Sequence, residues 1–145
     1  MPIEGISHIT LIVQDLERTA NLFKSVLGVE EVYASGEQTF SLSKEKFFFC
    51  AGVWLAIMEG RPLSEQSYNH IAFKIPESEL EESKRRLEEV GVESREGRPR
   101  VQGEGRSLYF YDYDNHLFEL HTGTLQERLQ AYGQSNRSSE GPIHR

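Results

Sequence analysis

Residues 6–14 alternate between hydrophobic and polar positions, a pattern typical of a β-strand that is buried on one face only. The hydrophobic positions are Ile9, Leu11 and Val13. His8 and Thr10 fall on the opposite face of the same strand. The pattern therefore predicts a strand that presents an imidazole and a hydroxyl away from the core.

A second strand of the same character is predicted at residues 68–75, YNHIAFKI. Its hydrophobic positions are Ile71, Phe73 and Ile75, and His70 lies on the other face. When residues 7–32 are aligned with residues 69–94, His8 falls on His70 and the Gly-Val pairs of the two segments lie one residue apart. The two histidines thus occupy equivalent positions in an internal repeat.

A helix is predicted after each of these strands, because hydrophobic residues recur at helical spacing. In the first helix, Asp15 is the expected N-cap and Gly28 the C-terminal stop, around the stripe Leu16, Ala20, Phe23 and Leu27. In the second helix, Ser78 is the expected N-cap and Gly91 the stop, around Leu80, Leu87 and Val90.

Three strand-like runs follow each helix: VEEVYAS, QTFSLS and VWLAIME in the first half, then VESRE, SLYFYDYD and HLFELHT. The predicted fold is therefore α+β, with two tandem βαβββ modules. We expect the first module over residues 1–62 and the second over residues 63–124. A short terminal helix is expected over residues 125–132 and a disordered tail over residues 133–145.

The last strands of the second module place polar residues on one face as well. Glu119 and His121 alternate with Phe118 and Leu120. In the preceding strand the polar row is Ser107, Tyr109 and Tyr111. A carboxylate within an apolar strand is costly unless it is paired with a charge or binds a metal. Two equivalent histidines and a glutamate that can face them, His8, His70 and Glu119, form a donor set for a divalent metal with open coordination positions.

Composition and charge narrow the class of protein. The chain has 145 residues, 37% of them hydrophobic and 27% charged, which is ordinary for a soluble globular protein. Its formal net charge of −7 argues against nucleic acid as the main partner. Cys50 is the single cysteine, so no intramolecular disulfide or cysteine-based zinc site is expected. The sequence shows neither a signal-peptide pattern nor an apolar run of membrane-spanning length, so a cytoplasmic location is expected.

Residues 95–106, REGRPRVQGEGR, concentrate positive charge in an acidic chain. The segment contains three glycines and four arginines, Arg95, Arg98, Arg100 and Arg106. Guanidinium groups and glycine backbone N–H groups suit an anionic ligand such as a phosphonate. The alternative for any one of these arginines is a place in a solvent-exposed charged loop.

The motifs SHITLIV, YNHIAFKI and DNHLFELH in paired βαβββ modules resemble those of the vicinal oxygen chelate superfamily, which includes glyoxalase I and extradiol dioxygenases. Within it, residues 3 to 130 most closely resemble the fosfomycin hydrolases, enzymes that confer resistance to an epoxide antibiotic. The resemblance implies a metal-dependent epoxide hydrolase that adds water at C1 of fosfomycin. It also implies Mn²⁺ as the ion, with other divalent metals as alternatives.

The same resemblance implies roles for individual residues. The metal ligands would be His8, His70 and Glu119, in a domain-swapped homodimer whose sites combine His8 of one subunit with the other two ligands from its partner. Glu45 would be the general base, and its position near the apolar run 47–49 suits a proton acceptor. The expected substrate contacts are Thr10, Ser107, Tyr109, Arg128 and Arg100, with Tyr68 and Trp54 as cavity walls.

Three other functions stay open for this sequence. A thiol transferase of the same family would add glutathione or bacillithiol to the epoxide, and a carboxylate at position 45 would crowd the incoming thiolate. A drug-sequestering protein would need neither the three ligands nor the base. An epoxide or glyoxalase-type enzyme with another native substrate is the third alternative. Glu59 and His116 are expected to be structural, and His121 is expected to orient Glu119 by a hydrogen bond.

Overall fold

The computed structural model describes residues 1–98 and 101–140 of the chain, with side chains up to residue 134. Its elements follow one another as two similar series. The first series is β1 (His8–Val13), α1 (Leu16–Leu22), the π-helical turn η1 (Phe23–Leu27), β2 (Glu30–Ala34), β3 (Glu45–Cys50) and β4 (Val53–Glu59). The second is β5 (His70–Lys74), the 3₁₀ turn η2 (Glu77–Glu79), α2 (Leu80–Glu89), β6 (Ser94–Glu96), β7 (Ser107–Tyr111), β8 (Leu117–His121) and the terminal helix α3 (Leu125–Glu140). The predicted α+β fold of two βαβββ modules is confirmed.

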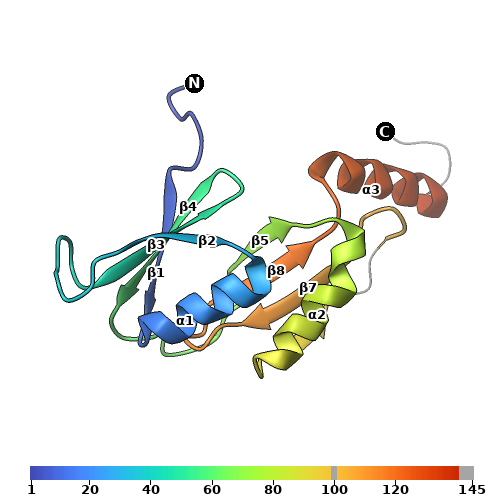
Figure 1. Cartoon of the computed structure of the whole chain (residues 1–145). Helices are drawn as coiled ribbons and strands as arrows, with labels where there is room; N and C mark the ends of the chain where they lie inside the picture. Colours follow the sequence, from blue (N-terminus) through green and yellow to red (C-terminus); the bar gives the residue numbers. More distant parts are fainter. Residues whose placement is uncertain (99–100, 141–145) are drawn as a thin grey trace. The chain divides into compact units, whose positions relative to one another are not determined.

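The chain forms two compact units (Figure 1). The first contains residues 1–69 and the hairpin tip Tyr111–Leu117, and the second contains His70–Phe110 and the chain from Phe118 onward. The hairpin tip is fixed within the first unit by polar contacts. The backbone N–H of Gln14 donates to Asp114 Oδ1 at 3.0 Å, and the side-chain amide of Asn115 donates to the carbonyl of Leu63 at 2.7 Å.

The first unit contains a four-stranded sheet in the order β1-β4-β3-β2. β1 runs parallel to β4, and β3 runs antiparallel to both β4 and β2. The side chains that α1 and η1 share with the sheet as a core are Leu11, Val13, Leu22, Phe23, Phe48, Leu55 and Ile57. As predicted, the side chain of Asp15 caps α1 by accepting from the N–H of Arg18 at 3.1 Å, and Gly28 ends the helical segment with φ 65°.

The second unit contains a four-stranded sheet in the order β5-β8-β7-β6, and α2 lies across one face of it (Figure 1). The buried hydrophobic residues beneath α2 are Leu80, Leu87, Leu108, Phe110, Phe118 and Leu120. Phe118 stacks between Phe73 and Phe110, with ring centroids 6.1 Å and 5.5 Å away. Each sheet is therefore covered by a helix on one face, and its other face is available for polar side chains.

Three sequence predictions about local structure are wrong. Residues 38–43 are not a strand: Phe40 and Leu42 are 70% and 86% exposed there, and the third strand of the first unit is β3. β3 pairs with β2 along one edge and with β4 along the other, so its backbone N–H and C=O groups are hydrogen-bonded on both edges. The alternating side chains of residues 38–43 have no buried surface to pack against.

The other two errors concern helix ends. Ser78 does not cap α2, because the N–H of Glu79 bonds to the carbonyl of Pro76 at 3.0 Å and places Ser78 inside the η2 turn. α3 extends through Glu140, beyond the helix end expected at residue 132. Residues 133–140 contain no proline and no β-branched side chain, so the sequence does not forbid continuation of the helix.

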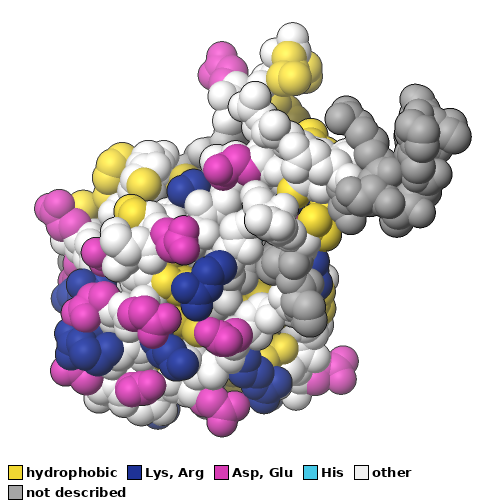
Figure 2. Space-filling model, turned by 90° about the vertical axis from the view of Figure 1, so that its right-hand side faces the viewer, with side chains coloured by type: hydrophobic (Ala, Val, Ile, Leu, Met, Phe, Trp, Pro, Cys, Tyr) yellow, Lys and Arg dark blue, Asp and Glu magenta, His cyan; other side chains and the backbone are white. Residues whose placement is uncertain are grey.

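On the face shown in Figure 2, acidic and basic side chains are interspersed and do not form one large acidic surface. In the described part of the chain, no helix has both the length and the apolar character needed to span a membrane.

Candidate active site

Strand pairing in the first unit brings four of the candidate residues onto one face of its sheet. His8 pairs with Trp54 and Thr10 with Ala56. Glu45 pairs with Met58, which itself pairs with Ile12 two residues beyond Thr10. Directly paired residues project from the same face of a sheet, and α1 covers the other face. His8, Thr10, Glu45 and Trp54 therefore share one face, which we call the first polar face.

Aromatic packing fixes the orientation of His8 on this face. Its imidazole centroid lies 4.3 Å from the Trp54 ring, and Trp54 in turn meets Phe47 edge-on at 5.0 Å. The hydroxyl of Ser7 lies 2.9 Å from Nδ1 of His8, which places Nε2 as the nitrogen available for another ligand.

The backbone of Glu45 is held by hydrogen bonds, whereas its carboxylate has no partner within the described part of the chain. The residue is 8% exposed, its N–H donates to Ser35 Oγ at 3.0 Å, and its carbonyl accepts from the N–H of Ser35 at 3.0 Å. Among the described residues, no group forms a hydrogen bond or ion pair with the Glu45 carboxylate. A buried carboxylate beside aromatic residues, without a hydrogen-bond donor among the described residues, is suited to accept a proton.

The two lysines next to Glu45 are paired elsewhere. Lys46 points to the opposite face of the sheet, where its ammonium group lies 3.0 Å from both Glu17 and Glu31. Burial lowers the pKa of Lys46, but the hydrogen bonds with Glu31 and Glu17 outweigh it, and the pKa lies above its usual value. Lys44 pairs with Glu37 at 3.1 Å. Neither lysine neutralises Glu45, despite the sequence SKEKFF.

The second unit carries a matching polar face on β5, β8 and β7. His70 Nε2 lies 3.0 Å from Glu119 Oε1, and the Ser107 hydroxyl donates to Glu119 Oε2 at 2.5 Å. Tyr109 meets the His70 ring edge-on, with centroids 5.6 Å apart. Glu119 is only 4% exposed, so its charge is held in place by these neighbours. We call His70, Ser107, Tyr109 and Glu119 the second polar face.

A chain of polar contacts leads from Glu119 to Arg128. The Ser107 hydroxyl lies 2.7 Å from Nδ1 of His121, and Nε2 of His121 lies 3.5 Å from the Arg128 guanidinium. Because Ser107 gives its only proton to Glu119, its oxygen accepts from His121, which then carries a proton on Nδ1. His121 is expected from the sequence to orient Glu119 by a hydrogen bond. In the structure this link runs through the Ser107 hydroxyl, which contacts both side chains.

The donor atoms on the second polar face fit a divalent ion. Imidazole nitrogen and carboxylate oxygen are ligands that Mn²⁺ and similar ions accept. Two neighbouring ligands of an octahedral ion with bonds of about 2.1 Å lie about 3 Å apart, as His70 Nε2 and Glu119 Oε1 do. Within residues 1–98 and 101–140, however, no group of three or more His, Cys, Asp or Glu side chains could hold a metal. His8 belongs to the first unit, and His70 and Glu119 to the second.

Several predicted residues lie elsewhere. Arg100 is outside the described residues. Tyr68 is exposed just before β5. His116 shapes the β7–β8 hairpin as expected, since its Nδ1 lies 2.8 Å from Asp112 Oδ2. A cavity of about 440 Å³ in the second unit is lined by Glu77, Val101, Gln102, Gly103, Gly105, Arg106, Thr122, Gly123 and Glu127, and it contains none of the predicted catalytic or metal-binding residues.

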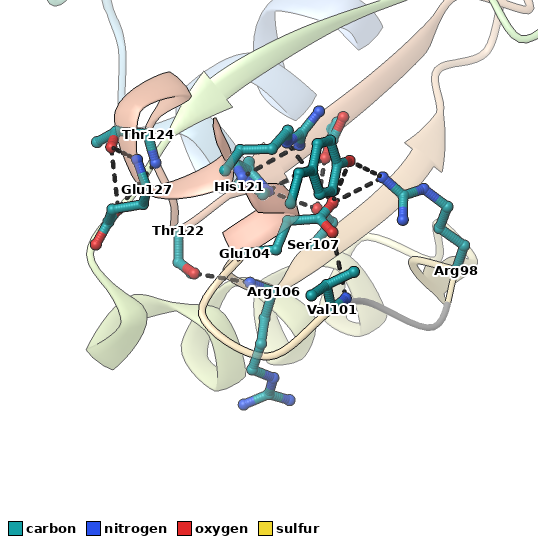
Figure 3. Close-up of polar contacts among 12 residues, drawn as sticks. Arg98, Val101, Glu104, Arg106, Ser107, His121, Thr122, Thr124 and Glu127 are labelled. Atoms are coloured by element: carbon teal, nitrogen blue, oxygen red, sulfur yellow. Dashed lines mark hydrogen bonds and ion pairs between the residues drawn. The ribbon is translucent and has the colours of Figure 1, made fainter. Parts of the chain in front are cut away.

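Sequence analysis missed one polar residue altogether. Glu104 is fully buried and lies 2.7 Å from the Arg98 guanidinium and 3.6 Å from that of Arg128 (Figure 3). Residues 95–106 contain two glutamates among four arginines, Glu96 and Glu104, and the sequence alone does not distinguish the buried one from the exposed one.

Comparison with known proteins relates the chain to a protein family. Residues 5–120 match the family model of the Glyoxalase/Bleomycin resistance protein/Dioxygenase superfamily. The fosfomycin resistance protein FosX of Listeria monocytogenes is 61% identical over 130 residues, covering 90% of this chain and 98% of that protein. FosX of Mesorhizobium japonicum is 57% identical over 127 residues, covering 88% and 91%. The metallothiol transferase FosB of Staphylococcus saprophyticus is 39% identical, covering 90% and 84%.

Solved structures give the same relationship. The crystal structure of a mutant FosX from Listeria monocytogenes, complexed with Mn(II) and 1S,2S-dihydroxypropylphosphonic acid, superposes with a TM-score of 0.81 at 55% sequence identity. The match covers 90% of this chain and 98% of that one. The chain therefore belongs to the Glyoxalase/Bleomycin resistance protein/Dioxygenase superfamily and, within it, to the FosX fosfomycin resistance proteins.

Proposed function

We propose that the protein is a Mn²⁺-dependent fosfomycin hydrolase that adds water to C1 of the epoxide and releases a diol phosphonate. The observation that carries the proposal is the His70–Glu119 pair, whose donor atoms converge at 3.0 Å while Ser107 holds the other carboxylate oxygen. The diol phosphonate in the FosX structure supports it, because that compound is what water addition to fosfomycin yields.

The two polar faces supply the parts of the site. We assign His70 and Glu119 as metal ligands from one subunit and His8 as the third ligand from a second subunit. His8 occupies the repeat position equivalent to His70 and projects from the uncovered face of its own sheet. When bound, the ion would act as a Lewis acid toward the oxirane oxygen and stabilise the negative charge that develops there.

Glu45 is the proposed general base. Its carboxylate would take a proton from water as the water oxygen forms a bond to C1 and the C1–O bond of the oxirane breaks. The released oxygen takes up a proton from solvent, and Glu45 returns its own proton to solvent, so the net change is the addition of one water. Strand pairing and the hydrogen bond to Ser35 fix the Glu45 backbone in β3, so that its carboxylate projects from the first polar face for this transfer.

The phosphonate requires donors close to the metal. We propose Arg128, Arg100, Thr10 and Tyr109 for this role, with Tyr68 and Trp54 as walls of the substrate cavity. The Ser107 proton is donated to Glu119, so we assign Ser107 to the orientation of Glu119 in place of the phosphonate contact expected from sequence.

The test is incubation of the purified protein with fosfomycin and Mn²⁺ in the absence of thiol, followed by phosphorus NMR. Appearance of the diol phosphonate, its loss on chelation, and a fall in kcat of at least about 100-fold in Glu45→Gln are expected. Lys44→Gln, which changes a half-buried neighbour paired with Glu37, is the matched control and should retain activity. Hydrolysis at the wild-type rate by Glu45→Gln would remove Glu45 from the mechanism.

The 39% identity to a metallothiol transferase favours thiol transfer as the second candidate. Turnover that begins only when glutathione or bacillithiol is added would establish it and would overturn the hydrolase. Tight binding of fosfomycin without any turnover, with or without thiol, would instead indicate sequestration.

A further inference from the structure

Glu104 is the most completely buried acidic side chain that the proposed mechanism does not use. It has no measurable exposure, and it lies in the turn that precedes β7, between Gly103 and Gly105. An isolated buried carboxylate is strongly destabilising, so its retention requires specific partners. The hydrogen-bond and ion-pair partners of Glu104 therefore indicate its role.

Glu104 receives donors from two separate parts of the second unit (Figure 3). Before the turn, Arg98 lies 2.7 Å from Oε2, and the N–H of Val101 donates to Oε1 at 3.2 Å. From α3, the Tyr132 hydroxyl donates to Oε2 at 3.1 Å, and Nε of Arg128 lies 3.6 Å away. The single carboxylate therefore joins the arginine-rich segment to the helix that carries Arg128.

The arrangement directs the two ends of the Arg128 guanidinium to different neighbours. Nε faces Glu104, while NH2 faces Nε2 of His121 at 3.5 Å. Arg98 is fixed in the same way, because its NH2 group contacts both Glu104 and the Tyr132 hydroxyl, at 2.7 Å and 3.1 Å. These two hydrogen bonds, with Tyr132 and with Glu104, raise the pKa of Arg98. Both arginines are thus held in fixed directions by groups that are themselves buried or tied to α3.

We propose that Glu104 is a positioning residue for phosphonate binding: it holds the guanidinium groups of Arg98 and Arg128 in fixed orientations, from which Arg128 receives the anionic group of the substrate. The proposal rests on the proposed function in taking a phosphonate as the anion. Binding of the phosphonate contributes equally to the bound substrate and to the transition state, since the reacting atoms are those of the epoxide. Loss of Glu104 should therefore raise KM and leave kcat nearly unchanged.

The experiment compares wild-type protein, Glu104→Gln and Glu96→Gln, all loaded with Mn²⁺. Glu96 is an exposed residue of the same segment, 3.6 Å from Arg106, and serves as the matched control. The affinity for propylphosphonate, which has no epoxide, is measured by calorimetry beside fosfomycin kinetics and Mn²⁺ affinity. In Glu104→Gln, the N–H donors of the new amide face the N–H donors of Arg98 and Arg128, so the two guanidinium groups are no longer held in place. We therefore expect about a tenfold increase in the propylphosphonate Kd and in KM. The Mn²⁺ Kd and kcat should change less than about twofold.

Tyr132→Phe provides a milder variant in case Glu104→Gln does not fold. It removes one hydrogen bond to Glu104 and one to Arg98 without leaving a buried charge unpaired, and it should raise the propylphosphonate Kd about threefold. Unchanged phosphonate affinity in folded Glu104→Gln, or in Tyr132→Phe where the first variant is unfolded, overturns the proposal. So does a loss of kcat at constant KM. Weakened propylphosphonate binding in a protein that does not hydrolyse fosfomycin would reject the hydrolase and keep the role of Glu104.

Discussion

Ser107 shows how a single hydroxyl can link two tasks of one site. Its proton goes to the carboxylate that we assign to the metal, and its oxygen accepts from His121, which contacts Arg128. A group that holds a ligand's second oxygen fixes the direction of the first, and loss of such a group commonly weakens metal binding without abolishing it. The hydroxyl is therefore expected to matter through Glu119.

Ser107→Ala should lower the affinity for Mn²⁺ about tenfold, because Glu119 loses the donor that fixes Oε2. Calorimetric titration of the metal-free protein with Mn²⁺ measures this directly. Ser78→Ala, on the exposed η2 turn, makes the same chemical change away from the site and should bind as wild type. Equal Mn²⁺ affinity in Ser107→Ala and wild type would contradict the role assigned to the hydroxyl.

At the residue scale, the sequence reveals which face a side chain occupies but not what it contacts. The alternation around His8, His70 and Glu119 placed them correctly on the uncovered faces. Glu104 could not be recognised, because its partner Tyr132 lies 28 residues away and a glutamate between two glycines looks like part of an exposed loop. Glu45 was likewise identified by resemblance alone, and its shared face with Thr10 became visible only from the strand register.

At the scale of elements, two chain segments meet near Glu104 without intervening side chains. A Cβ built on Gly123 would lie 2.5 Å from the carbonyl oxygen of Glu104 and 3.0 Å from His121 Nε2. Gly105, with φ 97°, approaches Gly123 from the other side. This close contact between the turn before β7 and the chain after β8 brings Glu104 within reach of α3.

Gly123→Ala should reduce the free energy of unfolding by about 1–3 kcal/mol, because the new methyl group collides with backbone atoms that cannot move independently. Gly133→Ala is the control: Gly133 lies in α3 with nothing near its added Cβ, and alanine there should raise stability by up to about 1 kcal/mol. Urea denaturation of both variants measures the two changes. A Gly123→Ala protein as stable as wild type would show that the two segments are not in rigid contact.

The elements themselves were predictable where one physical rule dominates. Asp15 and Gly28 determine the ends of the first helical segment through capping and a left-handed backbone, and both were identified. Residues 38–43 were wrongly predicted to be a strand, because an alternation of hydrophobic and polar residues does not show whether a partner strand is available for pairing. The strand forms at β3 instead, because EKFFFC pairs with a neighbouring strand along each of its edges.

At the scale of the whole molecule, the repeat distributes the three proposed metal ligands over two sheets. The first polar face carries His8, and the second carries His70 and Glu119. Oligomers with two-fold symmetry can combine such faces twice, because each surface meets its complement on the other subunit. If each site takes His8 from one subunit and His70 and Glu119 from the other, the activity of a dimer depends on how substitutions of these residues are distributed between its two subunits.

Mixing two inactive variants should therefore restore activity. In a dimer formed by a His8→Ala chain and a His70→Ala chain, one site joins the intact His8 of the second chain to the intact His70 and Glu119 of the first, and the other site carries both defects. The mixed dimer then has one complete site of two, so the purified mixed dimer should reach about half of the wild-type activity, and the unfractionated mixture, about half of which is mixed dimers, should reach about a quarter. Co-refolding with differently tagged chains, and assay of the doubly purified dimer, measures it. If all three ligands came from a single chain, no mixture could hold a complete site, and the mixed dimer would stay as inactive as its parents.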